Sequence, residues 1–323
     1  MSDLGLETRL ESGNVDKIGA DDHRRGMISI IIPTLNEAKI IESTLRTLAA
    51  TLTLPHEVIV SDGGSSDRTA ELAARHLNTV VVYSGAGRQT IGEGRNDGAK
   101  AATGDFLVFL DADCVIPEPD RFFAQALAHF ERDPGLVGLT AYLRVFPADE
   151  TLGDKLVSSI ANLGLWVANN LLKRGASFGE FQMIRREAFA RLGGFRADLI
   201  AFEDADMFHR LSRIGRTMIA PKLRVLHSGR RGHQVGHPRL IAMWLVNMVF
   251  LAVRDRTFSK DWKLIRSIVL PRRRGAGRAQ WLVSVAQTTA VRNDNFVRER
   301  QSGGEGEKRR LDDFFLIECG YDD

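Results

Sequence analysis

Two aspartates separated by one residue, Asp111 and Asp113, directly follow an unbroken apolar run over 106–110. The run is short and preceded by Gly104, which is typical of a strand buried on both faces. Because residues two apart in an extended chain point the same way, both carboxylates could face one crevice at the end of that strand. Carboxylates this close repel each other, and a divalent cation bound to phosphate oxygens would relieve the repulsion. A solvated turn is the alternative for so short a motif.

The elements that must position this pair alternate regularly along the first half of the chain. Strands are expected over 27–33, 57–61, 79–83 and 106–110, and helices over 40–48, 68–76 and 95–102. Gly85, Gly87, Gly92 and Gly94 are expected to form a flexible loop before the last of these helices. This alternation predicts an α/β fold, a mostly parallel sheet with helices on both faces. Ligands of such sheets bind at the carboxyl ends of the strands.

Composition excludes several classes of protein. The chain has 323 residues, 44% of them hydrophobic and 26% charged, with a net charge of +3, so we expect a globular protein that binds no nucleic acid. Two cysteines, Cys114 and Cys319, make no disulfide framework and indicate a reducing, cytoplasmic setting. We see no signal peptide in the polar first 26 residues. The glycines over 85–94 match neither a dinucleotide fingerprint nor a P-loop.

Four ordered segments resemble the family 2 inverting glycosyltransferases, which have the GT-A (nucleotide-diphospho-sugar transferase) fold. They read S-I-I-I-P-T-L-N-E, V-I-V-S-D-G-G-S-S-D, G-R-N-D-G-A and F-L-D-A-D, and the resemblance covers about two thirds of the chain, from Met27 to Gly232. It implies that the first half binds a nucleotide-sugar and that the second half receives the acceptor. We therefore expect a mobile tail at 1–26, a glycosyltransferase domain at 27–235, an apolar and basic helical segment at 236–270, and a basic linker with a C-terminal tail at 271–323.

The resemblance also implies which residues bind the donor. Asp62 falls on the aspartate that binds the base, but Gly63 replaces the second aspartate of the family's D-D-G-S, so the motif does not fix the base as uracil. Arg95 could contact the diphosphate, or could be a solvated arginine at a helix start. The remaining donor residues implied by the resemblance are Pro33, Thr34, Asn36, Glu37, Asp111, Ala112 and Asp113.

A divalent cation, Mg²⁺ or Mn²⁺, is implied as the cofactor. By the resemblance Asp113 is the stronger metal ligand, while Asp111 contacts the ribose or a water on the metal. His227, at the end of a strand expected over 225–227, stands where many GT-A enzymes have a histidine that completes the metal site. A surface or core histidine is the alternative reading.

The resemblance places the catalytic base in the second half. Glu203 and Asp204, in A-F-E-D-A-D, match the family's Glu-Asp pair, whose aspartate accepts the proton of the attacking hydroxyl. An aspartate near a helix start also serves commonly as an N-cap, which is the alternative. Asp206, two residues further on, should point elsewhere if the helix has begun.

Two segments indicate a membrane or acceptor surface. Apolar residues over 156–172 form one helical stripe. The segment 240–253 is almost wholly apolar and has basic residues on both sides, which suits an anionic membrane surface. As a helix it would measure about 21 Å, short of the roughly 30 Å hydrocarbon core, so we do not expect it to span. A helix buried against the domain or a second subunit is the alternative.

These observations predict a metal-dependent inverting glycosyltransferase, cytoplasmic or peripheral at the inner membrane face. It would move a sugar from a nucleotide-sugar, expected to be a UDP-sugar, to a hydroxyl of a lipid-linked or surface-glycan acceptor. One alternative is a catalytically silent GT-A domain that binds glycan or protein. A sugar nucleotidyltransferase is the other, although P-T-L-N-E at 33–37 replaces the G-x-G-x-R-like loop usual there.

Overall fold

The computed structural model describes residues 26–254, which lie within one compact unit. Almost all of the expected N-terminal tail, residues 255–270 of the expected helical segment, and the expected linker and C-terminal tail at 271–323 lie outside the described residues. The described part contains an eight-stranded sheet in the order β3-β2-β1-β4-β7-β6-β8-β5. Its strands are β1 (Ile28–Thr34), β2 (His56–Asp62), β3 (Val80–Val82), β4 (Phe106–Leu110), β5 (Cys114–Val115), β6 (Leu136–Val145), β7 (Phe181–Arg185) and β8 (Arg216–His227).

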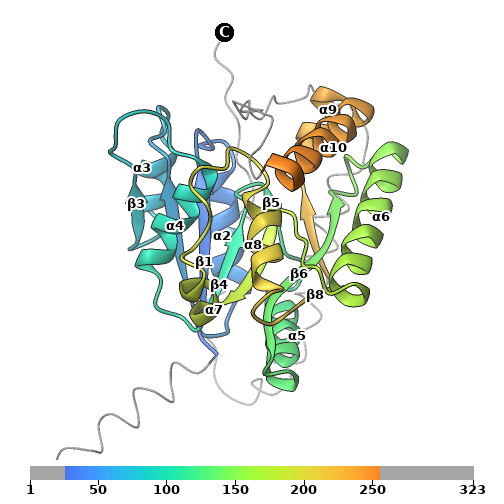
Figure 1. Cartoon of the computed structure of the whole chain (residues 1–323). Helices are drawn as coiled ribbons and strands as arrows, with labels where there is room; N and C mark the ends of the chain where they lie inside the picture. The colour runs from blue at the N-terminus through green and yellow to red at the C-terminus, as the bar shows by residue number, and fades with distance from the viewer. Residues whose placement is uncertain (1–25, 255–323) are drawn as a thin grey trace, which may run out of the picture. The chain divides into compact units, whose positions relative to one another are not determined.

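The four strands of the first half lie where the sequence predicts them, and they are parallel. β1 pairs with β2 on one side and β4 on the other, and β2 pairs with β3. The β1–β2 register places Thr34 opposite Asp62, so the expected donor loops begin side by side at one edge of the sheet. Figure 1 shows these strands together with α2, α3 and α4 in the blue to cyan half of the molecule.

The second half adds strands of mixed direction. β7 is antiparallel to β4 and β6, while β8 is parallel to β6 and antiparallel to β5. The final strand is longer than the expected 225–227, because it begins at Arg216 and continues past Pro221 through a register shift. Proline has no N–H to give to the ladder, which explains an irregularity there. The β5–β8 pairing sets Cys114 opposite His227.

Helices cover both faces of the sheet. They are α2 (Ile41–Thr51), α3 (Thr69–Ala74), α4 (Ile91–Ala101), α5 (Pro119–Arg132), α6 (Leu152–Trp166), the π-helical turn η1 (Val167–Leu171), α7 (Arg186–Arg191), α8 (Glu203–Leu211), α9 (Arg230–Val235) and α10 (His237–Arg254). Alternate strand residues point to opposite faces. Ile30 and Val108 thus pack in the core with α2 and α5, and Ile31 and Phe109 in the core with α7 and α8.

Helix α4 corrects the expected glycine loop. A capping box, in which Thr90 accepts the Glu93 N–H and Glu93 accepts the Thr90 N–H, starts the helix at Ile91. Gly92 and Gly94 are therefore helical and do not belong to a flexible loop. Arg95 consequently lies in the second turn of α4 and not at its start.

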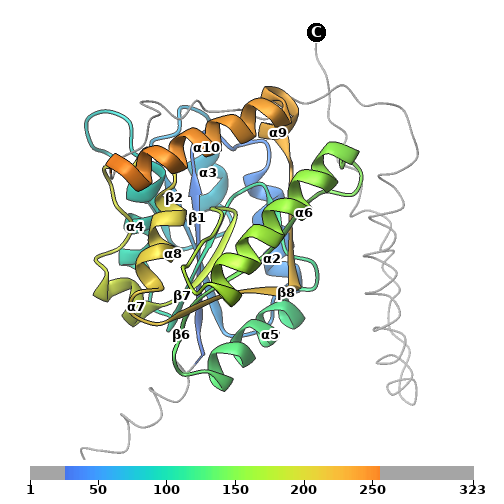
Figure 2. The same cartoon turned by 45° about the vertical axis from the view of Figure 1, so that its right-hand side comes forward.

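Helices α6, α9 and α10 are neighbours on one side of the molecule, and α6 also packs against strands β6 and β8. Figures 1 and 2 show α10 running across the top of the molecule next to α9, with α6 on the same side; α10 packs against both. The apolar residues expected over 156–172 are on α6 and η1, and the side chains at 156, 160, 163 and 171 are exposed. Among residues 26–254, no helix is long and apolar enough to cross a membrane.

Candidate active site

A cavity of about 1050 Å³ lies beyond the carboxyl ends of β1, β2 and β4 and is closed by segments of the second half. Both halves therefore line one cavity, as an enzyme that joins two substrates requires. Of the residues predicted from the sequence, its lining includes Pro33, Thr34, Glu37, Arg95, Asp111, Ala112, Glu203 and Asp204. Asn36, Asp62, Asp113 and His227 lie outside the lining.

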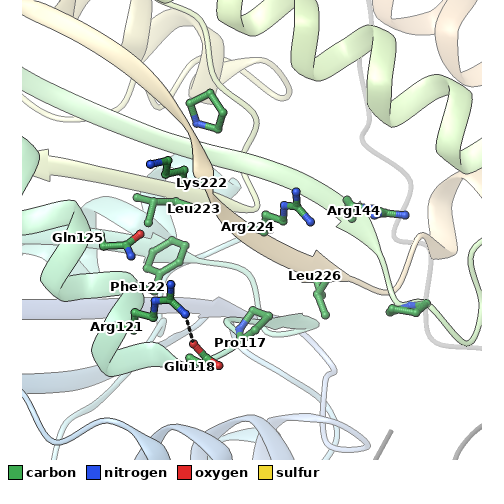
Figure 3. A pocket seen from close by; sticks show the side chains of 12 residues that line it. Pro117, Glu118, Arg121, Phe122, Gln125, Arg144, Lys222, Leu223, Arg224 and Leu226 are labelled. Atoms are coloured by element: carbon green, nitrogen blue, oxygen red, sulfur yellow. Dashed lines mark hydrogen bonds and ion pairs between the residues drawn. The ribbon is translucent and has the colours of Figure 1, made fainter. Parts of the chain in front are cut away.

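A second hollow, of about 700 Å³, lies between α5 and the strands β6 and β8 (Figure 3). It is rich in basic side chains, but two of them are paired locally. Arg121 lies 3.2 Å from Glu118, and Arg144 lies 2.6 Å from Glu150. None of the site residues predicted from the sequence lines this hollow, so we place the chemistry in the larger cavity.

Arg95 joins the two halves of the site. Its guanidinium donates to Glu203 at 2.7 Å, to Asp111 at 3.2 Å and to the Gly179 carbonyl at 2.9 Å. The side chain is only 2% exposed, so the reading of a solvated arginine is wrong. A contact between Arg95 and the diphosphate stays a prediction. The structure adds that Arg95 connects the end of β4 to the start of α8. A buried arginine with two carboxylates holds the strand-end aspartate at a fixed distance from α8.

Gly179 permits this close packing. A Cβ at position 179 would lie 2.6 Å from Arg95 Nη2 and 3.1 Å from Asp204 Oδ2. A side chain there would push apart the two groups that the site brings together. The glycine of F-G-E-F is therefore needed for space.

Asp204 is the second residue of α8 and faces the cavity. The N-cap of α8 is Phe202, at φ 64°, and no side chain caps the helix, so the N-cap reading of Asp204 is wrong. Its Oδ1 accepts the Ala205 N–H at 2.7 Å. Burial, and secondly the neighbouring Glu203, raise the pKa of Asp204 well above its ordinary value. A carboxylate of raised pKa is a stronger proton acceptor, which suits a general base.

Glu203 and Asp206, the two acidic neighbours of Asp204, are both engaged in ion pairs. Glu203 is bound to Arg95, as described above. Asp206 accepts from Arg210 Nε at 2.6 Å and lies 3.9 Å from Arg196. Asp206 does not line the cavity, as the sequence predicts for a residue two positions along the helix.

Glu180 is a cavity residue that sequence reasoning missed. Burial, and then the charge of Asp111, raise its pKa to about 7. The backbone places it there, because β7 pairs with β4 and the Asp111 N–H donates to the Glu180 carbonyl at 3.3 Å. A lone acidic residue within the apolar run F-G-E-F-Q-M-I was the only sequence signal for it.

Asp113 is held by the segment that follows β8. Ser228 Oγ donates to Asp113 Oδ2, and Arg230 Nε lies 3.1 Å from the same oxygen. Arg230 also binds Glu37 at 2.6 Å, so one arginine, absent from the sequence-based site, bridges two predicted donor residues. Desolvation raises the pKa of Glu37 and outweighs the opposing effect of Arg230.

Asp113 and His227 are the pair available to a metal. The β5–β8 pairing brings them near each other, and among residues 26–254 no cluster of three or more acidic, histidine or cysteine side chains could hold an ion. Burial lowers the pKa of His227, which favours the neutral imidazole that coordinates metals. Its Nδ1 accepts the Gly229 N–H at 3.2 Å, so Nε2 would be the ring nitrogen to bind a cation. The pair fits a cation that takes its other ligands from substrate phosphates.

The remaining predicted donor residues form the loops around Asp62. The Asp62 carboxylate is 1% exposed and accepts from Thr34 Oγ1 at 2.9 Å and from Ser65 Oγ at 2.6 Å. Asn36, at φ 59°, accepts the Ser66 N–H at 2.8 Å. These bonds tie the loop after β1 to the loop after β2 and leave Pro33 and Thr34 on the cavity wall.

Comparisons with known proteins agree with this architecture. The chain is 29% identical over 199 residues to the succinoglycan biosynthesis protein ExoA of Rhizobium meliloti, covering 58% of each chain. It is 26% identical over 178 residues to the poly-β-1,6-N-acetyl-D-glucosamine synthase of Staphylococcus aureus, covering 54% of this chain and 43% of that protein. The chain thus spans about half the length of the two relatives.

Among solved structures, the mannosyltransferase PcManGT of Pyrobaculum calidifontis, in complex with GDP-Man and Mn²⁺, is similar with a TM-score of 0.55 and 26% identity. The match covers 71% of this chain and 64% of that one. It confirms the expected GT-A fold. The family model described as glycosyl transferase family 2 matches residues 29–193, about half of the chain. The chain therefore belongs to glycosyl transferase family 2.

Proposed function

We propose that this protein is a metal-dependent inverting glycosyltransferase that moves a sugar from a nucleotide-sugar to a hydroxyl of a lipid-linked or surface-glycan acceptor. The main support is that one cavity is lined by both Asp111, at the end of β4, and Asp204, at the start of α8. Two relatives that act in polysaccharide synthesis, by their names, support the acceptor class. We assign transfer to residues 27–235 and treat α10, the described part of the expected segment 236–270, as an accessory helix.

The reaction needs one base and no covalent intermediate. The acceptor oxygen forms a bond to the anomeric carbon while the bond from that carbon to the diphosphate oxygen breaks. Asp204 takes the hydroxyl proton, and the nucleoside diphosphate leaves with the electron pair of the broken bond. Glu203 and Arg95 position Asp204 and Asp111 relative to each other.

The donor would lie along the first half of the cavity. Pro33, Thr34 and Glu37 form its wall there, and Asp111 and Ala112 its floor. We assign Asn36 and Asp62 to shaping the base pocket, because their side chains hold the two loops together. A UDP-sugar is our first candidate donor, and a GDP-sugar is the second because the mannosyltransferase relative binds GDP-Man.

Asp113 and His227 would hold the divalent cation, Mg²⁺ or Mn²⁺. The cation supplies positive charge that stabilises the leaving diphosphate. The relative solved with Mn²⁺ supports this assignment. Arg230, bound to Asp113 and Glu37, adds a fixed positive charge on the same side of the site.

A donor screen tests the proposal. The purified protein is incubated with UDP- and GDP-sugars, with Mn²⁺, with Mg²⁺ or with chelator, and the released nucleoside diphosphate is measured. We expect slow release through hydrolysis for one donor, dependent on the metal. Nucleotide binding without release under any condition would favour the catalytically silent module. Release of pyrophosphate from a nucleoside triphosphate and a sugar phosphate would show a nucleotidyltransferase.

A further inference from the structure

The outer face of α6, η1 and α10 is apolar and exposed. On α6 the exposed fraction is 62% for Leu156 and 63% for Ile160, and on α10 it is 52% for Leu245. We call the whole set the apolar stripe: Leu152, Leu156, Ile160, Leu163, Leu171, Leu172, Ile241, Leu245 and Val246. Side chains of this kind grouped on one face mark a contact site for a ligand, membrane or protein.

Part of this stripe also lines the catalytic cavity. Leu156, Ile160, Ile241 and Leu245 border the same space as Asp204, together with Trp244, which packs on Phe178 at 5.8 Å between ring centroids. We call these five residues the apolar arm of the cavity. Leu152 and Leu171 are equally exposed or more so, but do not line the cavity.

The size of the cavity leaves room for a second molecule beside the donor. Its volume of about 1050 Å³ is at the top of the range of ~300–1,000 Å³ that is usual for a single small-molecule site. The proposed donor contacts are on the polar wall of the cavity that the first half of the chain forms. The apolar arm belongs to the opposite, acceptor side, where a free sugar would gain little from five apolar side chains.

Two cationic side chains line the same cavity as the arm and the catalytic carboxylates. Arg230 and Arg231, from the helix just before α10, both line the cavity. Arg230 is bound to Glu37 and Asp113 on the donor side. Burial lowers the pKa of Arg231, and the charge of Glu180 is the largest effect that opposes this. An anionic group joined to a hydrocarbon chain would find cationic and apolar side chains within this one cavity.

We propose that the acceptor is an anionic amphiphile whose hydrocarbon chain lies in the apolar arm between α6 and α10. Its phosphate lies against Arg231 and its hydroxyl reaches Asp204. The inference rests on the proposed function and selects a lipid-linked acceptor over a free glycan. The arm is continuous with the catalytic cavity, whereas Leu152 and Leu171 lie outside it. This favours a bound amphiphile, because a bilayer surface or a second copy of the chain would contact Leu152 and Leu171 as well.

Binding of a simple amphiphile tests whether the arm holds a hydrocarbon chain, and the measurement does not require glycosyl transfer. Dodecyl phosphate, below the concentration at which it forms micelles, is titrated into the full-length protein by calorimetry, with ethyl phosphate for comparison. We expect dodecyl phosphate to bind at least about 100-fold more tightly, because the chain is buried. Equal binding of the two compounds, or no binding of dodecyl phosphate, would overturn the proposal.

Two matched double variants locate the site. Leu156→Gln with Ile160→Gln changes the arm, and Leu152→Gln with Leu171→Gln changes equally exposed residues outside it. We expect the first pair to weaken dodecyl phosphate binding by about tenfold or more and the second by less than about twofold. Equal losses in the two pairs, or no loss in the first, would show that the stripe serves another contact.

A separate measurement distinguishes this proposal from the proposed function. Affinity for the nucleoside diphosphate should be unchanged in both pairs, because neither touches the first half. Wild-type protein that binds dodecyl phosphate in the arm but releases no nucleoside diphosphate from any donor would refute glycosyl transfer alone. Donor turnover without dodecyl phosphate binding would refute the apolar arm alone.

Discussion

The carboxylates on the donor side and those on the acceptor side are held in different ways. Asp62 accepts from two hydroxyls, and Asp113 accepts from Ser228 and is paired with Arg230. On the acceptor side, the only hydrogen bond that the described residues give to the Asp204 carboxylate comes from the Ala205 N–H. Glu180 has no ion pair within residues 26–254, and its pKa is raised.

The difference shows two uses of an acidic side chain in and around one cavity. A carboxylate that accepts several hydrogen bonds is fixed in place, which suits binding a base, a cation or a loop. A buried carboxylate with few donors has a higher affinity for protons, which suits accepting one. Arg95 separates the two sets, since it pairs with Asp111 on one side and with Glu203 on the other.

Replacing Asp204 gives the largest expected effect and tests the acceptor side directly. Asp204→Asn keeps the size of the side chain but cannot accept the proton. We expect turnover to fall by about 10²–10⁴-fold, with donor affinity and melting temperature nearly unchanged. Asp206→Asn is the matched control. It weakens the ion pair with Arg210 and should lower the melting temperature more than the turnover. Near-normal turnover of Asp204→Asn would remove Asp204 as the base.

Removing the cation tests whether Asp113 binds a metal or only Arg230. Asp113→Ala and added chelator should each lower turnover by about 10²–10³-fold, because the metal contributes several kcal/mol at the leaving group. Arg230→Met should keep the metal dependence while weakening donor binding. The opposite pattern is full activity in chelator and no activity in Arg230→Met. It would show that Asp113 binds Arg230 and no metal.

Glu180 predicts a pH dependence of stability. Its folded pKa, about 7, exceeds its ordinary value of 4.5, so the folded protein binds more protons than the unfolded chain between these values. The free energy of unfolding should therefore decrease as the pH rises from about 4.5 to about 7. The upper limit is about 3 kcal/mol, and we expect less because the side chain borders an open cavity.

The variant Glu180→Gln should flatten that decrease, measured as urea unfolding midpoints across this pH range. Glu71→Gln is the control, because ion pairing with Arg68 lowers the pKa of Glu71 to about 2, below the tested window. An unchanged slope in Glu180→Gln would mean that Glu180 is not the group that resists ionisation.

The smallest expected effect is on nucleotide binding. Asp62→Ala should weaken nucleoside diphosphate binding by about 1.5–3 kcal/mol, the value of a hydrogen bond to a charged group. Ser65→Ala removes one loop contact of the same carboxylate and should change affinity much less. Equal losses in the two variants, measured by calorimetry, would show that Asp62 only supports the loop.

Sequence alone predicted the framework and several of the residues that line the cavity. Short apolar runs located β1, β2 and β4, and the carboxyl end of β4 located Asp111, which lines the cavity. These features depend on local spacing, since the side-chain direction along a strand or helix repeats every few residues. The same reasoning misplaced the start of α4, where it gave the glycines more weight than the Thr90–Glu93 capping box.

Tertiary structure decided which charges face each other. Arg95 and Glu203 are 108 residues apart, and Arg230 and Glu37 are 193 apart. Such pairs depend on which strands become neighbours, and no local pattern encodes that choice. For the same reason the sequence left open whether the apolar segment 240–253 is buried against the domain or forms a contact surface. Only the tertiary structure shows that Ile241 and Leu245 are exposed and line the cavity with Asp204.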